Sequence, residues 1–309
     1  MNSAQVPPPH PGSFVSRVAV SVVIATPFSA LCWADAMGVG GAAPAWWLMP
    51  VVMFIAVGGA GEAARMAHDH GLAIGWPIVA AATALVPLIA VAAGHAPGTS
   101  PVAVLGWVAC GLIAILGGLF VIEIVGYRQD TGCLHRITAR FLTIAAIGLP
   151  LAFMVGLRVL GGSGPVGLVP LVSMVAVVKG GDIAAYLVGS QIGRHRMASI
   201  VSPGKTWEGA AAAVVASLAV AWFILERSGW AMAEPWGGWP VYGLAVGLAG
   251  MLGDLSESLV KRELAVKDSG RALGGLGGFL DLVDAPLFAA PVAWLLWTLG
   301  GPGSAWPPA

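Results

Sequence analysis

Ten charged residues are concentrated between positions 254 and 284, in a chain of 309 residues of which only 10% are charged. Three carboxylates flank this stretch, with Asp254 before a basic segment and Asp281 and Asp284 after it. Four cationic side chains and then two Gly-Gly pairs lie between them, and such glycines let the backbone turn sharply or approach a ligand closely. Carboxylates beside cations and a flexible turn are typical of a divalent metal that holds a polyphosphate.

The spacing of these residues predicts that their side chains converge. If the segment around Asp254 ends a helix, Asp254, Ser258 and Lys261 stand at i, i+4 and i+7 and share one face. Asp281 and Asp284 stand at i and i+3 at the start of the next apolar segment, so their carboxylates also point in one direction. We therefore expect the three carboxylates to meet at one cavity.

A second group of polar residues lies between positions 179 and 209. Lys179 and Asp182 interrupt an apolar segment, where an unpaired charge costs about 2.5–3.5 kcal/mol, and their i, i+3 spacing lets them pair with each other. Tyr186 follows Asp182 at i+4 and faces the same way. Thr206 can cap the next helix while Lys205 reaches a phosphate. A capped loop at the membrane interface would explain the threonine but not the lysine.

Both stretches resemble the phosphatidate cytidylyltransferases, the CDP-diacylglycerol synthases. The downstream stretch is similar to their signature S-x-x-K-R-x(4)-K-D-x-G-x-x-[LIF]-P-G-H-G-G-x-x-D-R-x-D. The matching positions are Ser258, Lys261, Arg262, Lys267, Asp268, Gly270, Gly275, Gly277, Gly278, Asp281 and Asp284. Gly274, Leu276 and Leu282 stand where the family has Pro, His and Arg. The upstream stretch resembles the family's D-x-x-A-Y-x-x-G and S-P-K-K-T-W-E-G segments, with Gly204 replacing the first lysine.

The resemblance implies an enzyme that transfers a cytidylyl group from CTP to phosphatidate, giving CDP-diacylglycerol and pyrophosphate for phospholipid synthesis. It implies Mg²⁺ held by Asp254, Asp281 and Asp284, with a monovalent cation such as K⁺ near Ser258 and Asp268. The catalytic residues that it implies are Lys261, Arg262, Lys267 and Asp268. The substrate-binding residues that it implies are Asp182, Tyr186, Ser202, Lys205, Thr206, Arg271, Gly277 and Gly278. The partners are then CTP, phosphatidate and membrane lipids, without nucleic acid, and a homodimer is left open.

The rest of the chain has the composition of an integral membrane protein, with 58% hydrophobic residues and a mean hydropathy of +0.86. Crossing a hydrocarbon layer of ~30 Å takes about 20 apolar residues in a helix. Because no ten-residue alternation suggests a barrel, we expect an all-α polytopic fold with about nine transmembrane helices. The expected spans are 14–33, 46–65, 74–94, 102–127, 138–160, 166–189, 210–225, 241–260 and 279–299.

The organisation expected from these spans is a disordered lead over 1–13 and a single transmembrane domain over 14–309. Within that domain, we expect scaffold helices over 14–160 and a catalytic half over 161–309. Lys and Arg gather in the loops that follow even-numbered spans. The positive-inside rule then predicts a cytoplasmic N-terminus and a site that faces the cytoplasm from the inner membrane.

Two alternatives remain for the function. A transporter or channel could use Lys179, Asp182 and the cluster around Asp254 as an ion path. A catalytically degenerate relative could persist as a membrane scaffold. Three of the four departures, Gly204, Leu276 and Leu282, each replace a group that could donate to a phosphate. Losing one such charged contact costs about 1.5–3 kcal/mol where nothing compensates, so the resemblance implies a variant enzyme.

Overall fold

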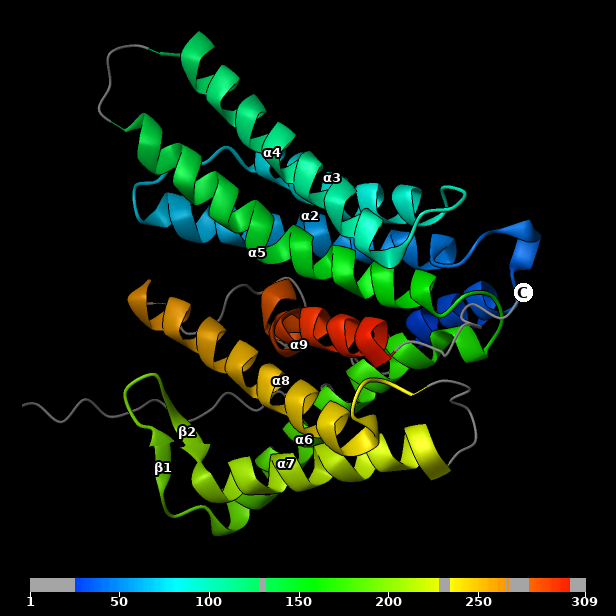
Figure 1. The fold of residues 1–309 in the computed structure, drawn as a ribbon. Coiled ribbons are helices and arrows are strands. Elements are labelled where there is room, and N and C mark those ends of the chain that lie inside the picture. The colour runs from blue at the N-terminus through cyan, green and yellow to red at the C-terminus, as the bar shows by residue number, and fades with distance from the viewer. Residues whose placement is uncertain (1–25, 128–131, 228–233, 265, 267–277, 301–309) are drawn as a thin grey trace, which may run out of the picture.

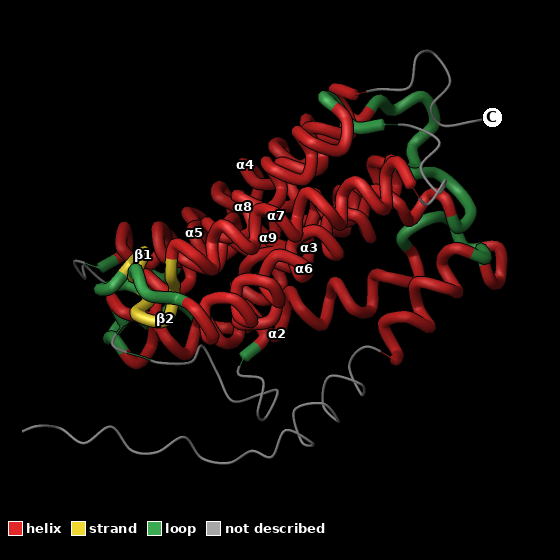
Figure 2. The backbone as a smooth tube through the Cα atoms, turned by 90° about the horizontal axis from the view of Figure 1, so that it is seen from below, coloured by secondary structure: helices red, strands yellow, loops and turns green. Residues whose placement is uncertain are grey.

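A computed structural model of the chain describes residues 26–127, 132–227, 234–264, 266 and 278–300. These residues form long helices joined by turns, with one short β-hairpin (Figures 1 and 2). Eight helices in the described part of the chain are long and apolar enough to cross a membrane, which confirms an all-α polytopic membrane protein. The expected lead over 1–13 lies outside the described residues, as do residues 14–25 of the first expected span. Its remaining residues, 26–33, are helical, and this helix continues to residue 36.

The remaining eight expected spans each correspond to one observed helix, with ends that agree to within about five residues. The helices are α2 (Met49–Asp69), α3 (Trp76–Gly94), α4 (Pro101–Val125), α5 (Cys133–Leu160), α6 (Val169–Ile192), α7 (Trp207–Trp222), α8 (Gly238–Glu263) and α9 (Phe279–Gly300). The strands β1 (Arg196–Ala198) and β2 (Ser202–Thr206) pair antiparallel. A short π-helical segment, Phe223–Arg227, extends α7.

Helix α9 lies between the two halves of the molecule. It contacts α2 and α5 on one side and α6 and α8 on the other, as Figure 1 shows in orange and red. Val283 and Leu287 of α9 pack into a core shared with α2 and α5, whereas Trp294 and Trp297 pack into a core shared with α6 and α8. The acidic first turn of α9 is therefore held in place by both halves.

Helix α5 is fixed near both ends by buried ion pairs. Near its C-terminus, Arg158 contacts Asp35 at 2.5 Å, and both side chains are fully buried. Near its N-terminus, Arg136 and Arg140 contact the Glu123 carboxylate at 2.6 and 2.5 Å. Because removing one partner of a buried pair leaves an uncompensated charge, these contacts fix α5 against α4 and against the segment that carries Asp35.

The hairpin β1–β2 connects α6 to α7. At its base, the Trp207 N–H donates to the His195 carbonyl oxygen at 2.9 Å, and the Glu208 carboxylate lies 2.7 Å from His195 Nδ1. Thr206 Oγ1 accepts the Gly209 N–H at 3.1 Å, so the predicted capping of the helix by Thr206 is confirmed. The hairpin itself is not expected from the sequence, which indicates only a loop here.

Candidate active site

Helices α8 and α9 cross closely where their carboxylates lie. A Cβ atom at Gly253 would lie 2.6 Å from the Asp284 carbonyl oxygen and 2.9 Å from Phe288 Cβ. Glycine at this position therefore allows the two backbones to approach each other. The next residue, Asp254, and Glu257 one turn later then face the first turn of α9.

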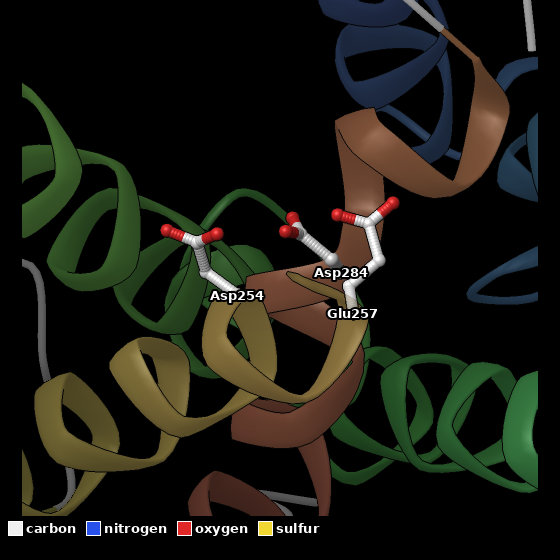
Figure 3. Close-up of side chains that lie close together, drawn as sticks. All are labelled: Asp254, Glu257 and Asp284. Carbon is white, nitrogen blue, oxygen red and sulfur yellow. The ribbon is translucent and has the colours of Figure 1, made fainter. Parts of the chain in front are cut away.

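Three carboxylates meet at this crossing. Asp254, Glu257 and Asp284 each offer an oxygen atom, and these atoms all lie within 4.8 Å of one another (Figure 3). Each side chain is partly buried. Carboxylate oxygens are the ligands that hard divalent cations prefer, so this donor set fits Mg²⁺ or a similar ion. Like charges held this close also require a compensating positive charge.

The cluster differs in one member from the set expected for a metal. The structure brings together Asp254 and Asp284, but Asp281 accepts hydrogen bonds from Lys261 Nζ at 2.8 Å and from the Gly278 N–H at 2.6 Å. Glu257, which the sequence analysis did not single out, completes the cluster. Its i+3 spacing from Asp254 could have identified it, because both residues then share a helix face.

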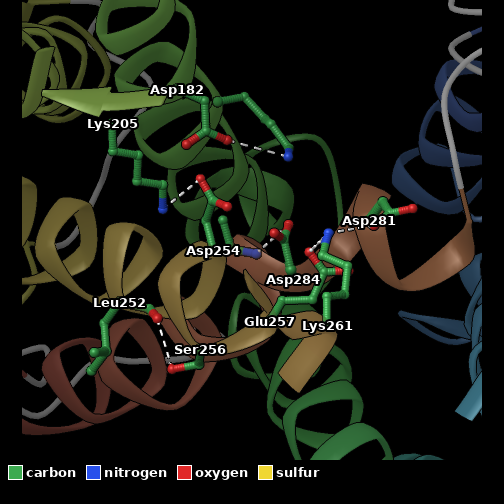
Figure 4. Close-up of polar contacts among 11 residues, drawn as sticks. Asp182, Lys205, Leu252, Asp254, Ser256, Glu257, Lys261, Asp281 and Asp284 are labelled. Atoms are coloured by element: carbon green, nitrogen blue, oxygen red, sulfur yellow. Dashed lines mark hydrogen bonds and ion pairs between the residues drawn. The ribbon is translucent and has the colours of Figure 1, made fainter. Parts of the chain in front are cut away.

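Three lysines pair with carboxylates around the cluster (Figure 4). Lys205 Nζ lies 2.8 Å from Asp254 Oδ2 and is buried, but the contact is not aligned as a hydrogen bond. Lys261 Nζ bridges Glu257 Oε2 and Asp281 Oδ1, at 2.8 Å from each. Lys179 lies 3.3 Å from Asp182, which confirms that these two side chains pair within α6.

These side chains line one cavity of about 570 Å³. The described residues of its wall come from α6, β1, β2, α7, α8 and the start of α9, so both polar stretches of the sequence contribute to it. The formally charged residues among them are Lys179, Asp182, Lys205, Asp254, Glu257, Lys261, Asp281 and Asp284. Five carboxylates against three lysines leave a formal charge of −2, which one divalent cation would balance.

Other expected substrate-binding residues also border this cavity. Ser202 and Thr206 of β2 line it, as do Asp182 and Tyr186 of α6, and Tyr186 is 73% exposed. The Thr206 hydroxyl is buried and already accepts the capping hydrogen bond of α7. Gly204 lines the cavity too, and a Cβ atom there would have no heavy atom of the described residues within 4 Å.

The remaining expected residues lie elsewhere or outside the described part of the chain. Ser258 is half-buried on α8, and Arg262 is exposed, with its Nε donating to the Val201 carbonyl oxygen at 3.1 Å. Neither belongs to the described wall of the cavity. Gly278 contributes its backbone N–H to Asp281. Lys267, Asp268, Arg271 and Gly277 lie outside the described residues.

Comparison with known proteins agrees with the resemblance seen in the sequence. Residues 15–299 match the Cytidylyltransferase family. The chain is 43% identical over 143 residues to a phosphatidate cytidylyltransferase of Brucella suis biovar 1, covering 45% of this chain and 50% of the relative. It is 40% identical over 138 residues to one of Synechocystis sp., covering 42% and 43%. It is 39% identical over 130 residues to one of Mycobacterium tuberculosis (strain ATCC 25618 / H37Rv), covering 41% and 37%.

The aligned part of this chain thus spans about half, or less, of the length of these curated relatives. Membership of a cytidylyltransferase family also suggests a general dependence on a divalent metal, which the carboxylate cluster fits. Because the family match extends over nearly the whole sequence, this chain belongs to the cytidylyltransferase family.

Proposed function

We propose that this protein is a phosphatidate cytidylyltransferase, which converts CTP and phosphatidate into CDP-diacylglycerol and pyrophosphate. Its family supports a nucleotidyltransferase, and the names of its relatives support phosphatidate as the acceptor. The observation that carries the proposal is the single cavity in which a carboxylate cluster and three lysines lie together. A negatively charged cluster surrounded by cations is suited to binding a metal–triphosphate complex.

In this reaction, a phosphate oxygen of phosphatidate attacks the α-phosphorus of CTP in line. The new oxygen–phosphorus bond forms as the bond between the α-phosphorus and the bridging oxygen breaks, and pyrophosphate leaves with the electron pair. Both reactants are anions, so the enzyme must position them and neutralise the charge that develops on the leaving group. The phosphatidate phosphate is already ionised near neutral pH, so the reaction needs no nucleophilic side chain.

The divalent ion that we propose is Mg²⁺, held by Asp254, Glu257 and Asp284. When bound, such an ion supplies Lewis-acid stabilisation of phosphoryl oxygens and a template for the triphosphate. Asp281 was expected among the ligands, and we now propose that it holds Lys261 in position instead. A monovalent cation such as K⁺ near Ser258 and Asp268 stays a prediction from the resemblance.

The lysines of the cavity are proposed to bind phosphates. Lys205 is the best placed, because its buried ammonium group already lies beside the cluster without using a hydrogen bond among the described residues. Lys261 is oriented by two carboxylates, and Asp281 is in turn oriented by the Gly278 N–H. Phosphate binding by Lys267 and Arg271, and a role of Gly277, remain predictions. A charged hydrogen bond of this kind contributes about 1.5–3 kcal/mol.

The location that we propose is the inner membrane, with the cavity open to the cytoplasm. The distribution of Lys and Arg supports this orientation, and CTP would enter from water while the diacyl substrate enters from the inner leaflet. Residues 161–309 would form the catalytic half, because every described residue lining the cavity lies there. Residues 14–160 would be scaffold. A homodimer stays open.

The test is synthesis of CDP-diacylglycerol by the purified protein in detergent or lipid, with CTP, phosphatidate and Mg²⁺. We expect CDP-diacylglycerol and pyrophosphate in equal amounts, with no product after chelation of the metal. The matched control is Asp284→Asn, which keeps the size of the side chain but removes a charge from the cluster. A folded wild-type protein that binds CTP without turnover would indicate a degenerate relative, and ion flux into proteoliposomes without CTP would indicate a transporter.

A further inference from the structure

The hairpin β1–β2 forms one wall of the cavity. Strand β2 places Ser202, Gly204 and Lys205 along this wall, and Lys205 reaches Asp254 on α8. A short two-stranded hairpin is marginally stable by itself, so its position depends on what fixes its two ends. The ends of this hairpin are fixed in different ways.

The base of the hairpin is fixed by α6 and α7. The Trp207 N–H and the Glu208 carboxylate both contact His195, and Thr206 caps α7. Thr206 also packs closely on the end of α6. A Cβ atom at Gly189 would lie 3.1 Å from Thr206 Oγ1, and one at Gly193, directly after the helix, would lie 2.7 Å from the Thr206 side chain. These contacts hold the ends of the two strands where they join the helices.

The tip of the hairpin is tied to α8 by an arginine. Arg262 Nε donates to the Val201 carbonyl oxygen at 3.1 Å, across 61 positions of sequence. The neighbouring tip residue Ile200 is 87% exposed, so little packing holds this end of the hairpin. Because Val201 immediately precedes β2, the Arg262 contact acts directly on the strand that carries Lys205.

Consecutive residues of α8 point in different directions at this position. In a helix with 3.6 residues per turn, neighbouring side chains diverge by about 100°. Lys261 lines the cavity and contacts Glu257 and Asp281, whereas Arg262 is exposed and lies outside the described wall of the cavity. The adjacent pair of basic residues therefore faces two different parts of the structure.

We propose that Arg262 is a positioning residue that holds the tip of the β1–β2 hairpin against α8, and thereby keeps Lys205 beside Asp254. It acts on the nucleotide through Lys205 and does not itself bind a phosphate. The part concerning the nucleotide rests on the proposed function, whereas the tether between Arg262 and Val201 is independent of it.

The tether is tested first without substrate, by amide hydrogen exchange of the intact protein in detergent. Arg262→Gln should speed exchange in residues 196–206 by about tenfold, while exchange in α6 and α7 stays as in the wild type. Arg262→Lys should restore most of the protection, because an ammonium group can still donate to the Val201 carbonyl. The control Arg196→Gln removes an exposed charge from the same hairpin and should leave exchange unchanged.

The effect on the nucleotide is tested by kinetics of the same variants. Arg262→Gln should raise KM for CTP by about tenfold and change kcat by less than about threefold, since the cluster on α8 and α9 is intact. In a Lys205→Gln background, Arg262→Gln should raise KM for CTP little further, because the contact that Lys205 makes beside Asp254 is already lost.

Two results would overturn the proposal. Unchanged exchange of the hairpin in Arg262→Gln would show that no tether exists, even if turnover falls. Fully additive losses in the double variant would show that Arg262 acts on the substrate independently of Lys205. If the wild-type protein shows no CTP turnover, the proposed function fails, and the exchange experiment still decides whether the tether exists.

Discussion

At the residue scale, Glu257 and Asp281 are the two candidates, among the described carboxylates, for the third metal ligand beside Asp254 and Asp284. Glu257 lies within the cluster of Asp254 and Asp284, whereas Asp281 contacts Lys261 and the Gly278 N–H. The first arrangement is suited to a metal ligand and the second to a residue that orients a lysine. The two roles predict different consequences of neutral substitutions.

Glu257→Gln should raise the Mg²⁺ concentration needed for half-maximal CTP turnover by at least about tenfold, because it removes a charged ligand. Asp281→Asn should instead lower kcat, because Lys261 loses one of its two carboxylate partners. The measurement is a Mg²⁺ titration of turnover, with Glu263→Gln as the exposed control on the same helix. A wild-type Mg²⁺ requirement in Glu257→Gln would contradict the assignment.

Two departures from the family's sequence patterns, Gly204 in the upstream segment and Leu282 in the downstream signature, have different structural surroundings. Gly204 lines the cavity, and no described side chain lies near its Cβ position. Gly204→Lys should therefore fit and lower KM for CTP, by up to about tenfold for one charged contact. Leu282 is partly buried and packs against the apolar core shared by α2, α5 and α9, so Leu282→Arg should lower the thermal unfolding temperature without improving KM.

The matched control for the first substitution is Gly204→Ala, which adds a side chain without charge. Steady-state kinetics and thermal unfolding of the three variants provide the measurement. A Gly204→Lys variant that behaves like Gly204→Ala would show that no phosphate comes near this part of β2.

Much of this site could be predicted at the residue scale. The expected residues Asp254, Asp284, Lys205 and Lys261 do line one cavity. Helical spacing explains why Asp254 and Lys261 share a face of α8, whereas Lys205 on β2 and Asp284 on α9 were expected there from the resemblance. Glu257 was missed because it directly precedes the first residue of the signature. The sequence could not show that Asp281 turns to Lys261, because that depends on how α9 starts after Gly278.

The crossing of α8 and α9 is the critical contact at the element scale. Gly253→Ala should reduce turnover by at least about tenfold, since the new Cβ atom would push on the Asp284 backbone and separate the cluster. The control Gly117→Ala lies on α4, and in the described part of the chain no heavy atom lies within 4 Å of its Cβ position. It should be neutral or stabilise the helix by up to about 1 kcal/mol.

Turnover and Mg²⁺ dependence of these two variants provide the measurement, with circular dichroism to show that both remain helical. Wild-type turnover in Gly253→Ala would mean that the close approach of α8 and α9 does not determine the position of the carboxylates.

The helices could be predicted as elements but the hairpin could not. Apolar runs of about 20 residues are unambiguous signals, and eight observed helices follow them. Strands β1 and β2 have only three and five residues, too short for an alternating pattern, and β2 contains Pro203 and Gly204, which disfavour strands. Their pairing depends on contacts with α7 and α8 that no local pattern encodes.

At the scale of the whole molecule, neutralising one partner of a buried ion pair should lower the free energy of unfolding. Asp35 and Arg158 are fully buried and joined at 2.5 Å, and the Ala45 and Trp47 N–H groups also donate to the Asp35 carboxylate. Asp35→Asn should cost about 3–5 kcal/mol of unfolding free energy, because the arginine keeps a buried charge without its partner.

Thermal unfolding in detergent measures this cost, and Asp69→Asn, which removes an exposed carboxylate, is the control. Equal unfolding temperatures for the wild type and Asp35→Asn would show that the pair does not stabilise the fold. Neither Asp35 nor Arg158 is among the described residues that line the cavity, so the Asp35→Asn protein that remains folded should keep its KM for CTP.

The orientation of the molecule is also testable. The background is a variant in which all three cysteines are replaced by serine. In this background, the introduced thiol of Ser199→Cys, in the exposed hairpin, should react with a membrane-impermeant maleimide only from the cytoplasmic side. The introduced thiol of Ser163→Cys, in the exposed turn between α5 and α6, should react only from the opposite side. Reversed labelling would place the cavity outside the cytoplasm and contradict access to CTP.

The most direct test is a structure of the protein with Mn²⁺ and a non-hydrolysable CTP analogue, with the metal located by its anomalous signal. We predict one metal at ligand distance from oxygens of Asp254, Glu257 and Asp284 and from the triphosphate, with Lys205 against a phosphate. A bound nucleotide whose metal lies away from these three carboxylates, or that has none, would contradict the account.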